Sequence, residues 1–523
     1  MAAAGNEKLP DLKEIRNKCR NDIERCLNEF QGRKDIVLDP ELMKPLDRIT
    51  GGAAFLKENG VDKIFKLDRA DKQTKLVGCD RRVYLVKPKI NIMKIIADHI
   101  SSEQSRGEYR KYRIVMVPRR LFLCEMILEQ EGVLGHCELD EADLNLLPLD
   151  TDILSMETPE FFKSFYLDND MTLLQTVSKS IQTIQGFMGE IPNVYCLGRA
   201  GKMCYELLKQ MSGGDRLIEP DYTRSQIGHM FLIDRGIDFV TPLCSQVTYE
   251  GLLDDMFGIQ CGCVEFGKDV TQKDQPVKVR LSSEDEMYDA IRCRHFTNVF
   301  DFLKSKAQDL QSVSDKRKNF TKVKDMKDFV ANDLRKLNQS KANLTYHIGA
   351  CEQIIKKKNK GDFQEYMQTE HSLLEGTAFR ENLNYIEECI NKQIPSVDVD
   401  LRSPCDMSYV FSGAYSPLSC KLVEQVLQRE GFLGMEEITK HLPGSVHSEV
   451  KLQTPGKGTK GMSNQPGRAA RVVLVYFIGG CSYSEIAALR FLGKQTGYKF
   501  IVATTSIFNG NTMLETVIEK PAL

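Results

Sequence analysis

Short apolar runs alternate with stretches of helical period along the first part of the chain. A run at residues 35–38 leads into "PELMKPLDRI", a run at 84–86 leads into "INIMKIIADHI", and a run at 113–117 leads into "RRLFLCEMILEQEG". Strands that alternate with helices are typical of a parallel sheet, because parallel strands need helical crossovers. The pattern predicts a first α/β domain over residues 1–137.

A second α/β pattern follows and is interrupted. "LLQTVSKSIQTIQGFM" is helical, and "IGHMFLI" reads as a buried strand. From residue 249 to about 391 the pattern is helical with almost no strand signal, and strands return in "RVVLVYFIGG" and "YKFIVATTS". An isolated two-stranded piece would be marginally stable. We therefore predict a discontinuous second domain, 138–248 and 405–523, with a helical third domain, 249–404, inserted into it.

The predicted insertion contains a heptad seam. Its apolar positions are separated by alternating gaps of four and three residues, with Lys341 within the seam. An upstream amphipathic helix and the polar connector "SDKRKNFTKVKD" predict a helical hairpin whose tip projects into solvent. Two interpretations stay open: the seam packs inside the hairpin, or part of it receives a helix from another protein. The seam positions are Val330, Leu334, Leu337, Leu344 and Ile348.

Composition excludes several classes of protein. The 523 residues are 41% hydrophobic, with 71 basic and 73 acidic side chains, so no net field favours nucleic acid or an anionic membrane. No apolar run reaches the roughly 18 residues of a membrane span, and neither a secretory leader nor a prenylation cysteine is apparent. We expect a cytoplasmic protein that reaches membranes indirectly, through partners.

Metal and cofactor signals are weak. The sixteen cysteines are scattered, which suits reduced thiols packed as small apolar groups. Cys261 and Cys263 form the only tight pair, without a second pair or a histidine at ligand spacing. We predict no metal site and no cofactor.

Two glycine-containing segments resemble parts of enzyme motifs. "GKGTKG" at 456–461 has the letters of a dinucleotide fingerprint, but neither a strand before it nor a helix after it, and reads as a linker. The turn Gly479–Gly480 lies between a predicted strand and helix, yet Ser482 and Glu485 fit a capping box that would satisfy the free amides. His229 reads as structural. We predict no enzyme; the alternative is a nucleotide-binding protein or enzyme that uses the Gly479–Gly480 turn.

Three charged residues interrupt the apolar stretch at 230–255. Asp234 ends the predicted strand, Arg235 adjoins it, and Asp238 lies one turn beyond. A carboxylate at a strand end can accept amide hydrogens of the next turn, and a nearby arginine can offset its charge. Catalytic carboxylates or a metal site would need several such oxygens to converge. The simpler interpretation is a rigid elbow between the sheet domain and the insertion.

The residues that follow predict a helix. Thr241 and Pro242 fit the N-cap and the first position of a helix. Gln246, Glu250 and Asp254 recur at a spacing of four residues, which predicts one helical face.

The same stretch resembles the signature of the SM family of SNARE regulators, which reads D-R-x-x-D-x-x-T-P-L-x-x-Q-x-T-Y-E-G-L-x-D. The matching positions are Asp234, Arg235, Asp238, Thr241, Pro242, Leu243, Gln246, Thr248, Tyr249, Glu250, Gly251, Leu252 and Asp254. "LPLDTDILSME", "HIGACEQIIKKK" and "GGCSYSEIAALRFLG" resemble the vacuolar sorting branch of this family. The resemblance covers nearly the whole chain.

The resemblance implies an arch-shaped, non-enzymatic protein with two α/β parallel-sheet domains and an inserted helical domain. Such proteins bind SNAREs, including syntaxin-type SNAREs, and the hairpin templates helix pairing. The branch acts in tethering complexes, so the resemblance implies peripheral association with late endosome and lysosome membranes. The implied recruiting partner is a tethering-complex subunit or an apical-basolateral polarity regulator.

One departure from the family lies late in the insertion. After a helix ending near Asn391, "KQIPSVDVDLRSP" leads directly to "CDMSYVFSGAY", where relatives carry a further helical stretch. The resemblance therefore predicts a third domain that is shortened near residues 392–404.

Overall fold

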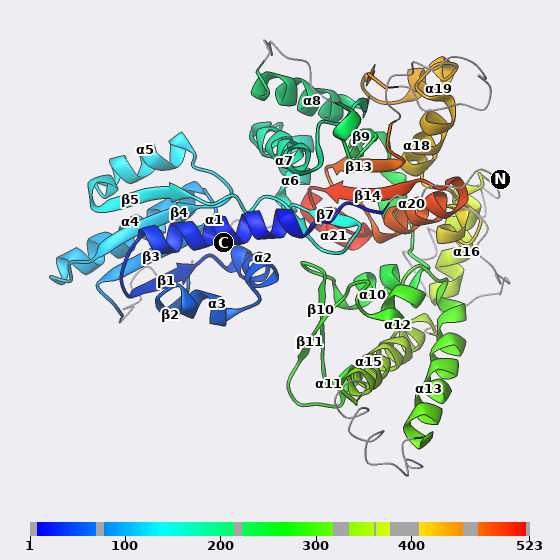
Figure 1. Cartoon of the computed structure of the whole chain (residues 1–523), viewed down its shortest axis with the longest axis horizontal. Helices are drawn as coiled ribbons and strands as arrows, with labels where there is room; N and C mark the ends of the chain where they lie inside the picture. The colour runs from blue at the N-terminus through cyan, green and yellow to red at the C-terminus, as the bar shows by residue number, and fades with distance from the viewer. Residues whose placement is uncertain are drawn as a thin grey trace.

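The computed structural model describes residues 8–68, 78–213, 222–316, 334–359, 362–376, 407–452 and 469–518. Within these residues, two mainly parallel sheets lie side by side, and a mainly helical region extends from the second sheet (Figure 1). The predicted mixed α/β class is confirmed.

The first sheet is entirely parallel, with strand order β2-β1-β3-β4-β5. On α4, Ile92, Ile96 and Ile100 lie four residues apart and are fully buried, so this helical face covers the sheet. The strands are β1 (Lys34–Leu38), β2 (Val61–Lys66), β3 (Arg81–Val86), β4 (Lys111–Met116) and β5 (Cys137–Glu141). The helices are α1 (Lys13–Glu29), α2 (Pro40–Thr50), α3 (Ala53–Glu58), α4 (Ile90–Ser105) and α5 (Phe122–Gln130). Strand β5 begins at residue 137, where the first domain was predicted to end, and continues to Glu141.

The second sheet joins two distant parts of the chain in the order β12-β8-β9-β13-β14-β7-β6. Strands β9 and β13 pair in parallel, with Met230 opposite Leu474, and β12 and β6 add antiparallel edges. The strands are β6 (Leu147–Pro148), β7 (Ile153–Ser155), β8 (Asn193–Leu197), β9 (His229–Asp234), β12 (Val446–Val450), β13 (Val472–Ile478) and β14 (Lys499–Thr504). The helices are α6 (Glu160–Tyr166), α7 (Thr172–Met188), α8 (Arg199–Met211), α18 (Leu418–Arg429), α19 (Glu436–His441), α20 (Tyr483–Thr496) and α21 (Gly510–Val517).

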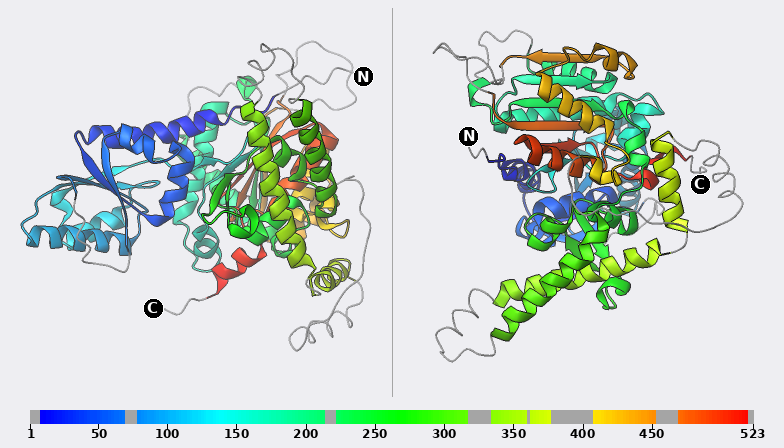
Figure 2. Two further views of the ribbon diagram at one scale, coloured as in Figure 1. Left: turned by 90° about the horizontal axis from the view of Figure 1, so that it is seen from below. Right: turned by 90° about the vertical axis from the view of Figure 1, so that its right-hand side faces the viewer.

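The region between these two parts is mainly helical. Helices α13 and α15 lie side by side and project away from the sheets (Figure 2). The expectation of almost no strand signal was wrong at β10 (Cys263–Phe266) and β11 (Val277–Arg280), which form an antiparallel pair. Four residues of alternation are too few to stand out among helical neighbours. The helices are α9 (Val240–Leu243), α10 (Tyr249–Phe257), α11 (Lys268–Thr271), α12 (Glu286–Ile291), α13 (Val299–Lys316), α15 (Leu334–Lys358) and α16 (Asp362–Leu374).

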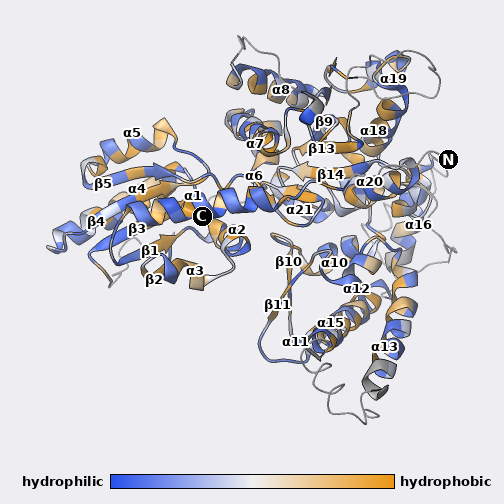
Figure 3. Ribbon diagram, in the orientation of Figure 1, coloured by the Kyte–Doolittle hydropathy of each residue, from blue (hydrophilic) through white to orange (hydrophobic). Residues whose placement is uncertain are grey.

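Apolar residues concentrate in the central strands of the second sheet, as β13 and β14 show (Figure 3). All seven residues of β13 are buried, which matches the continuous apolar run of a strand covered on both faces. Among the described residues, none of the helices combines the length and apolarity required to span a bilayer. Val330, the "GKGTKG" segment and residues 392–404 lie outside the described residues.

Candidate functional site

The signature stretch begins at the end of β9, where Asp234 is buried. One carboxylate oxygen accepts the amide hydrogen of Gly236 at 2.7 Å and the hydroxyl of Tyr166, and the other accepts the amide hydrogen of Ala200 at 2.7 Å. Ala200 lies in α8 and Tyr166 ends α6. Asp234 therefore fastens the strand end to two helices.

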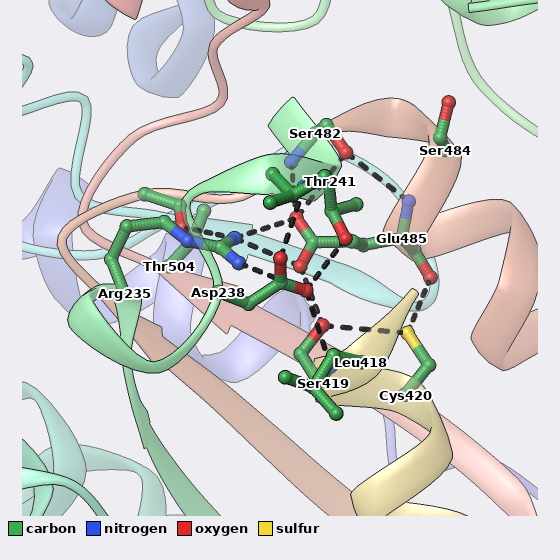
Figure 4. A network of polar contacts seen from close by, with 12 residues as sticks. Arg235, Asp238, Thr241, Leu418, Ser419, Cys420, Ser482, Ser484, Glu485 and Thr504 are labelled. Carbon is green, nitrogen blue, oxygen red and sulfur yellow. Dashed lines mark hydrogen bonds and ion pairs between the residues drawn. The ribbon is translucent and has the colours of Figure 1, made fainter. Parts of the chain in front are cut away.

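Arg235 is fully buried within a cluster of polar side chains (Figure 4). Its Nη1 donates to both carboxylate oxygens of Glu485 at 2.8 Å, and its Nη2 lies 3.5 Å from Asp238. Burial opposes the charge of Arg235, but Glu485 and Asp238 outweigh it and raise its pKa. The Ser419 hydroxyl also donates to Glu485, at 2.6 Å. The cluster thus joins the turn after β9 to α18 and α20.

The prediction that Thr241 caps a helix and Pro242 begins it was wrong. Helix α9 begins at Val240 with Phe239 as its N-cap, so both predicted residues lie inside it. The Asp238 carboxylate accepts the amide hydrogen of Thr241 at 3.0 Å and its hydroxyl at 2.6 Å. Aspartate and threonine both suit helix N-termini, so composition alone did not decide between them.

Gln246 does not share a helical face with Glu250 and Asp254, contrary to the prediction, because it precedes α10. Its Oε1 accepts the amide and hydroxyl hydrogens of Ser484 at 3.2 Å each, and its Nε2 donates to the Gly251 carbonyl at 3.3 Å. A Cβ on Gly251 would lie 2.6 Å from Gln246 Oε1, so a side chain there would displace the glutamine.

Helix α10 is fastened on two sides. The Tyr249 hydroxyl lies 2.8 Å from His347 Nδ1, and His347 Nε2 lies 3.1 Å from Asp285. On the other side, Glu250 accepts a hydrogen bond from Arg490 at 2.9 Å. His347 belongs to α15 and Arg490 to α20. The signature therefore connects the base of the hairpin to a helix of the second sheet.

Several members of this network were missed by sequence reasoning. Arg490 was the most visible signal, as a lone charge in the apolar run "IAALRFL". It donates to both oxygens of Asp152, at 2.8 and 3.0 Å. Burial opposes its charge, but Asp152 and Glu250 raise the pKa of Arg490 well above its usual value. The missed members are Asp152, Asp285, His347, Ser419 and Arg490.

The predicted capping box at α20 is confirmed. Ser482 Oγ accepts the Glu485 amide hydrogen at 3.3 Å, and the Glu485 carboxylate accepts the Ser482 amide hydrogen at 3.0 Å. A Cβ on Gly480 would lie only 1.6 Å from the Phe508 ring, which fills the space beside the turn. These contacts remove the structural basis for a nucleotide site at Gly479–Gly480.

His229, which begins β9, is 2% exposed, and burial lowers its pKa to about 4. The unfolded chain binds a proton below about pH 6.5, whereas the folded protein resists it until about pH 4. Stability is therefore lost as the pH falls through this window. We measure the free energy of unfolding in urea for His229→Phe and for the unmodified protein. The difference, variant minus unmodified protein, should be about 2 kcal/mol more positive at pH 5 than at pH 8.

The exposed histidine His136 supplies the control for this experiment. His136→Asn should have little effect on stability, because substitutions of exposed side chains usually change it by less than about 0.5 kcal/mol. If the effect of His229→Phe on stability were independent of pH, it would contradict the conclusion that burial of His229 destabilises the protein at low pH.

The structure describes part of the predicted SNARE-binding seam. Leu334 begins α15, although its side chain lies outside the described part. Leu337 and Leu344 are only 7% and 8% exposed, and Ile348 packs against the main core. At Leu337 and Leu344 the seam is therefore packed within the protein, and helix α13 lies alongside α15. Val330 is outside the described residues.

One group of side chains in the described part has metal-ligand atoms close together. The ligand atoms of Asp35, Asp62 and Cys79 lie within 4.8 Å of one another. Asp35 already accepts the Cys79 amide hydrogen, and Asp62 lies 3.8 Å from Arg33. One thiol with two carboxylates is not among the usual ligand sets of structural zinc.

A family comparison identifies the class of protein that carries this network. The Sec1 family model matches residues 34–403 and 397–516, so the chain belongs to the Sec1 family of SM proteins, regulators of SNARE complexes in vesicle trafficking. The chain is 37% identical to vacuolar protein sorting-associated protein 33B of Danio rerio, and the alignment covers 98% of each chain. It is 36% identical to the Homo sapiens protein of that name, again over 98% of each chain.

Solved structures support the same fold. The Unc18–syntaxin 1 complex from Monosiga brevicollis has a TM-score of 0.59 at 14% identity, covering 96% of this chain and 99% of that chain. Sly1p in complex with an N-terminal peptide of Sed5p has a TM-score of 0.57 at 13% identity, covering 98% of both chains.

The alignment with the Danio rerio relative is longer than this chain. The alignment with the Danio rerio relative extends over 619 positions, whereas this chain has 523 residues, so at least 96 aligned positions have no residue here. The two matches of the family model meet at residues 397–403.

Proposed function

We propose that this protein is a non-enzymatic regulator that binds SNAREs, syntaxin-type SNAREs among them, and promotes vesicle docking and fusion in endosomal and lysosomal trafficking. Membership of the Sec1 family and the vacuolar sorting names of the relatives support this proposal. Two solved structures of similar fold are complexes with a syntaxin or with a peptide of Sed5p.

The hairpin of α13 and α15 carries the proposal. It projects from the molecule, but buried hydrogen bonds of His347 to Tyr249 and Asp285 hold its base. A projecting helix with a rigid base can present a heptad seam to another helix, and SNARE bundles pack with the same heptad period.

We propose that the seam has two parts with different roles. The burial of Leu337 and Leu344 supports a role in holding the hairpin together. Val330 and Leu334 lie nearer the predicted tip and are the positions that we expect to contact a SNARE helix, with Ile348 supporting α15 against the core.

Fluorescence anisotropy with a labelled syntaxin-type endosomal SNARE segment tests this function. We expect saturable binding to the full chain. Leu334→Asp should weaken it at least about tenfold, because a charge would replace an apolar contact at the centre of a helix interface. Asn338→Asp is the matched control: it adds the same charge at an exposed position of α15 and should leave affinity nearly unchanged.

Two different results would contradict two different parts of this proposal. Absence of saturable binding by a folded, monodisperse chain would refute the proposed function in this form. Equal affinity of Leu334→Asp and the unmodified chain would refute only the position of the contact.

We also propose the predicted three-domain division with its first boundary moved from residue 137 to the end of β5: 1–141, 142–248 with 405–523, and 249–404, with the third domain shortened near 392–404. The family model's two matches meet at residues 397–403, which supports this position. Recruitment to late endosome and lysosome membranes would depend on a tethering-complex subunit or a polarity regulator.

The signature residues themselves we propose as a structural elbow. These residues are buried and hydrogen-bond to other side chains of the same protein. Asp234 is bonded to Tyr166, Arg235 to Glu485, and Glu250 to Arg490. A side chain whose charge is already matched inside the protein is not available to a substrate or partner.

A further inference from the structure

A cavity of about 540 Å³ lies where the second sheet meets the base of the helical insertion. Its walls come from the end of α20, the start of β14, the turn that follows α12 and the N-terminal segment at Leu9. Because Lys499 begins β14, the cavity lies at the amino-terminal edge of the parallel strands, whereas the Gly479–Gly480 turn follows β13 at the opposite edge. The cavity is therefore separate from that turn.

The charges that line the cavity are unbalanced. The lining includes five cationic side chains but only two carboxylates. Each carboxylate is already matched by an arginine of the same lining: Asp152 accepts hydrogen bonds from Arg490 at 2.8 and 3.0 Å, and Asp289 lies 2.7 Å from Arg292. The cations that remain are Arg294, Lys494 and Lys499.

These three cations are exposed, and in the described ranges none of them takes part in an ion pair. Arg294 donates to the Ala290 carbonyl at 2.7 Å, and the ammonium of Lys494 lies 5.5 Å from the centre of the Phe491 ring. Neither contact neutralises a positive charge. The whole chain carries a net charge of −2, so the surplus of three positive charges is a local property of this cavity.

A cleft lined by one sign of charge focuses its field and attracts ligands of the opposite sign. A phosphate monoester carries about 1.5 to 2 negative charges at pH 7 and three acceptor oxygens. Two such groups therefore balance the three unmatched cations. Lysine and arginine are both common phosphate-binding side chains.

The positions of the three cations favour a ligand with phosphates on more than one side. Arg294 follows α12, Lys494 lies in the last turn of α20, and Lys499 begins β14. Between them, the partly exposed side chains of Leu9 and Tyr498 offer apolar surface. The C–H groups of a small ring can pack against such a wall.

We propose that this cavity binds a small polyol ring that carries two or more phosphate groups, either free in solution or as the headgroup of a lipid. Arg294 belongs to the insertion, whereas Lys494 and Lys499 belong to the second sheet. A bound ligand would therefore connect these two parts of the protein.

Calorimetric titration of the full chain tests the proposal at an ionic strength of about 0.15 M, where interactions between exposed charges more than about 8 Å apart are largely screened. myo-Inositol 1,4-bisphosphate should bind at one site at least about tenfold tighter than myo-inositol 1-phosphate, because its second phosphate makes further charge-assisted hydrogen bonds. Equal affinities for the two probes, or no binding of the bisphosphate, would overturn the proposal.

Two double variants locate the interaction. Lys494→Gln with Lys499→Gln should weaken binding of the bisphosphate at least about tenfold, because two phosphate contacts are lost. Lys57→Gln with Lys111→Gln is the matched control: it removes the same charge at exposed positions of α3 and β4, outside the cavity, and should change the affinity less than about twofold. Equal weakening by the two double variants would indicate diffuse attraction and overturn the site.

Vesicles distinguish a free ligand from a lipid headgroup. If the ligand is a headgroup, the chain should sediment with phosphatidylcholine vesicles that contain phosphatidylinositol 4-phosphate, and soluble bisphosphate should release it. If the ligand is free in solution, the chain should bind the soluble bisphosphate without sedimenting. Sedimentation that Lys494→Gln with Lys499→Gln leaves unchanged would overturn binding of a headgroup in this cavity.

Discussion

Replacing Arg235 with methionine is expected to lower the free energy of unfolding by about 3–5 kcal/mol, measured by urea denaturation. Arg235 and Glu485 are both fully buried, and the guanidinium contacts both carboxylate oxygens at 2.8 Å. Methionine removes the cation and leaves the carboxylate of Glu485 in an interior that cannot hydrate it. This is the largest loss that we expect from a single substitution in the signature.

A second substitution separates charge from packing. In Arg235→Met with Glu485→Gln, no unpaired buried charge remains, so much of the loss should be recovered. Lys268→Met is the surface control: its pair with Asp274 is equally short, 2.7 Å, but 71% and 87% exposed, and its loss should cost less than about 1 kcal/mol. An Arg235→Met variant as stable as the Lys268→Met variant would contradict the role of the buried pair.

Replacing His347 with leucine is expected to loosen the hairpin from the rest of the protein. His347 is fully buried, and its loss leaves the buried Tyr249 hydroxyl without its partner, whereas Asp285 still accepts the Met287 amide hydrogen. The unsatisfied hydroxyl costs about 1–3 kcal/mol. In hydrogen exchange, amides of α15 should exchange faster while those of β13 and β14 keep their protection.

The same variant connects stability to function. If the hairpin is the SNARE platform, His347→Leu should weaken SNARE binding in parallel with the loss of protection in α15. Tyr249→Phe is the milder counterpart, because it removes one hydroxyl and keeps the ring, and its effects should be smaller in both measurements. Faster exchange throughout the second sheet would contradict a local role for His347.

The alternation of strand and helix predicted the central strands of both sheets, such as β1, β9 and β13, because these are buried along their whole length. Such strands read as continuous apolar runs, as in β13, and the helices between them carry a different period. Strands β10 and β11 were missed because each has only four residues. Their pairing stabilises them through contacts that a local pattern does not contain.

The candidate site was predicted unevenly. The capping box of Ser482 and Glu485 was recognised because its partners lie three residues apart. The role of Gln246 was not recognised, because its hydrogen-bond partner Ser484 lies 238 residues away in the sequence. The sequence left the burial of Leu337 undecided, because a heptad seam has the same period whether it faces a neighbouring helix of the same chain or a partner.

The sequence by itself determined the family, the two sheet-forming regions and the insertion between them, because signatures and periodicity are local properties of the chain. Only the tertiary structure decided which charges meet. Arg235 and Glu485 are 250 residues apart, and Glu250 and Arg490 are 240 apart. Pairing at such distances depends on the folded path of the backbone, and the burial that makes it strong exists only after the sheets and the insertion have packed together.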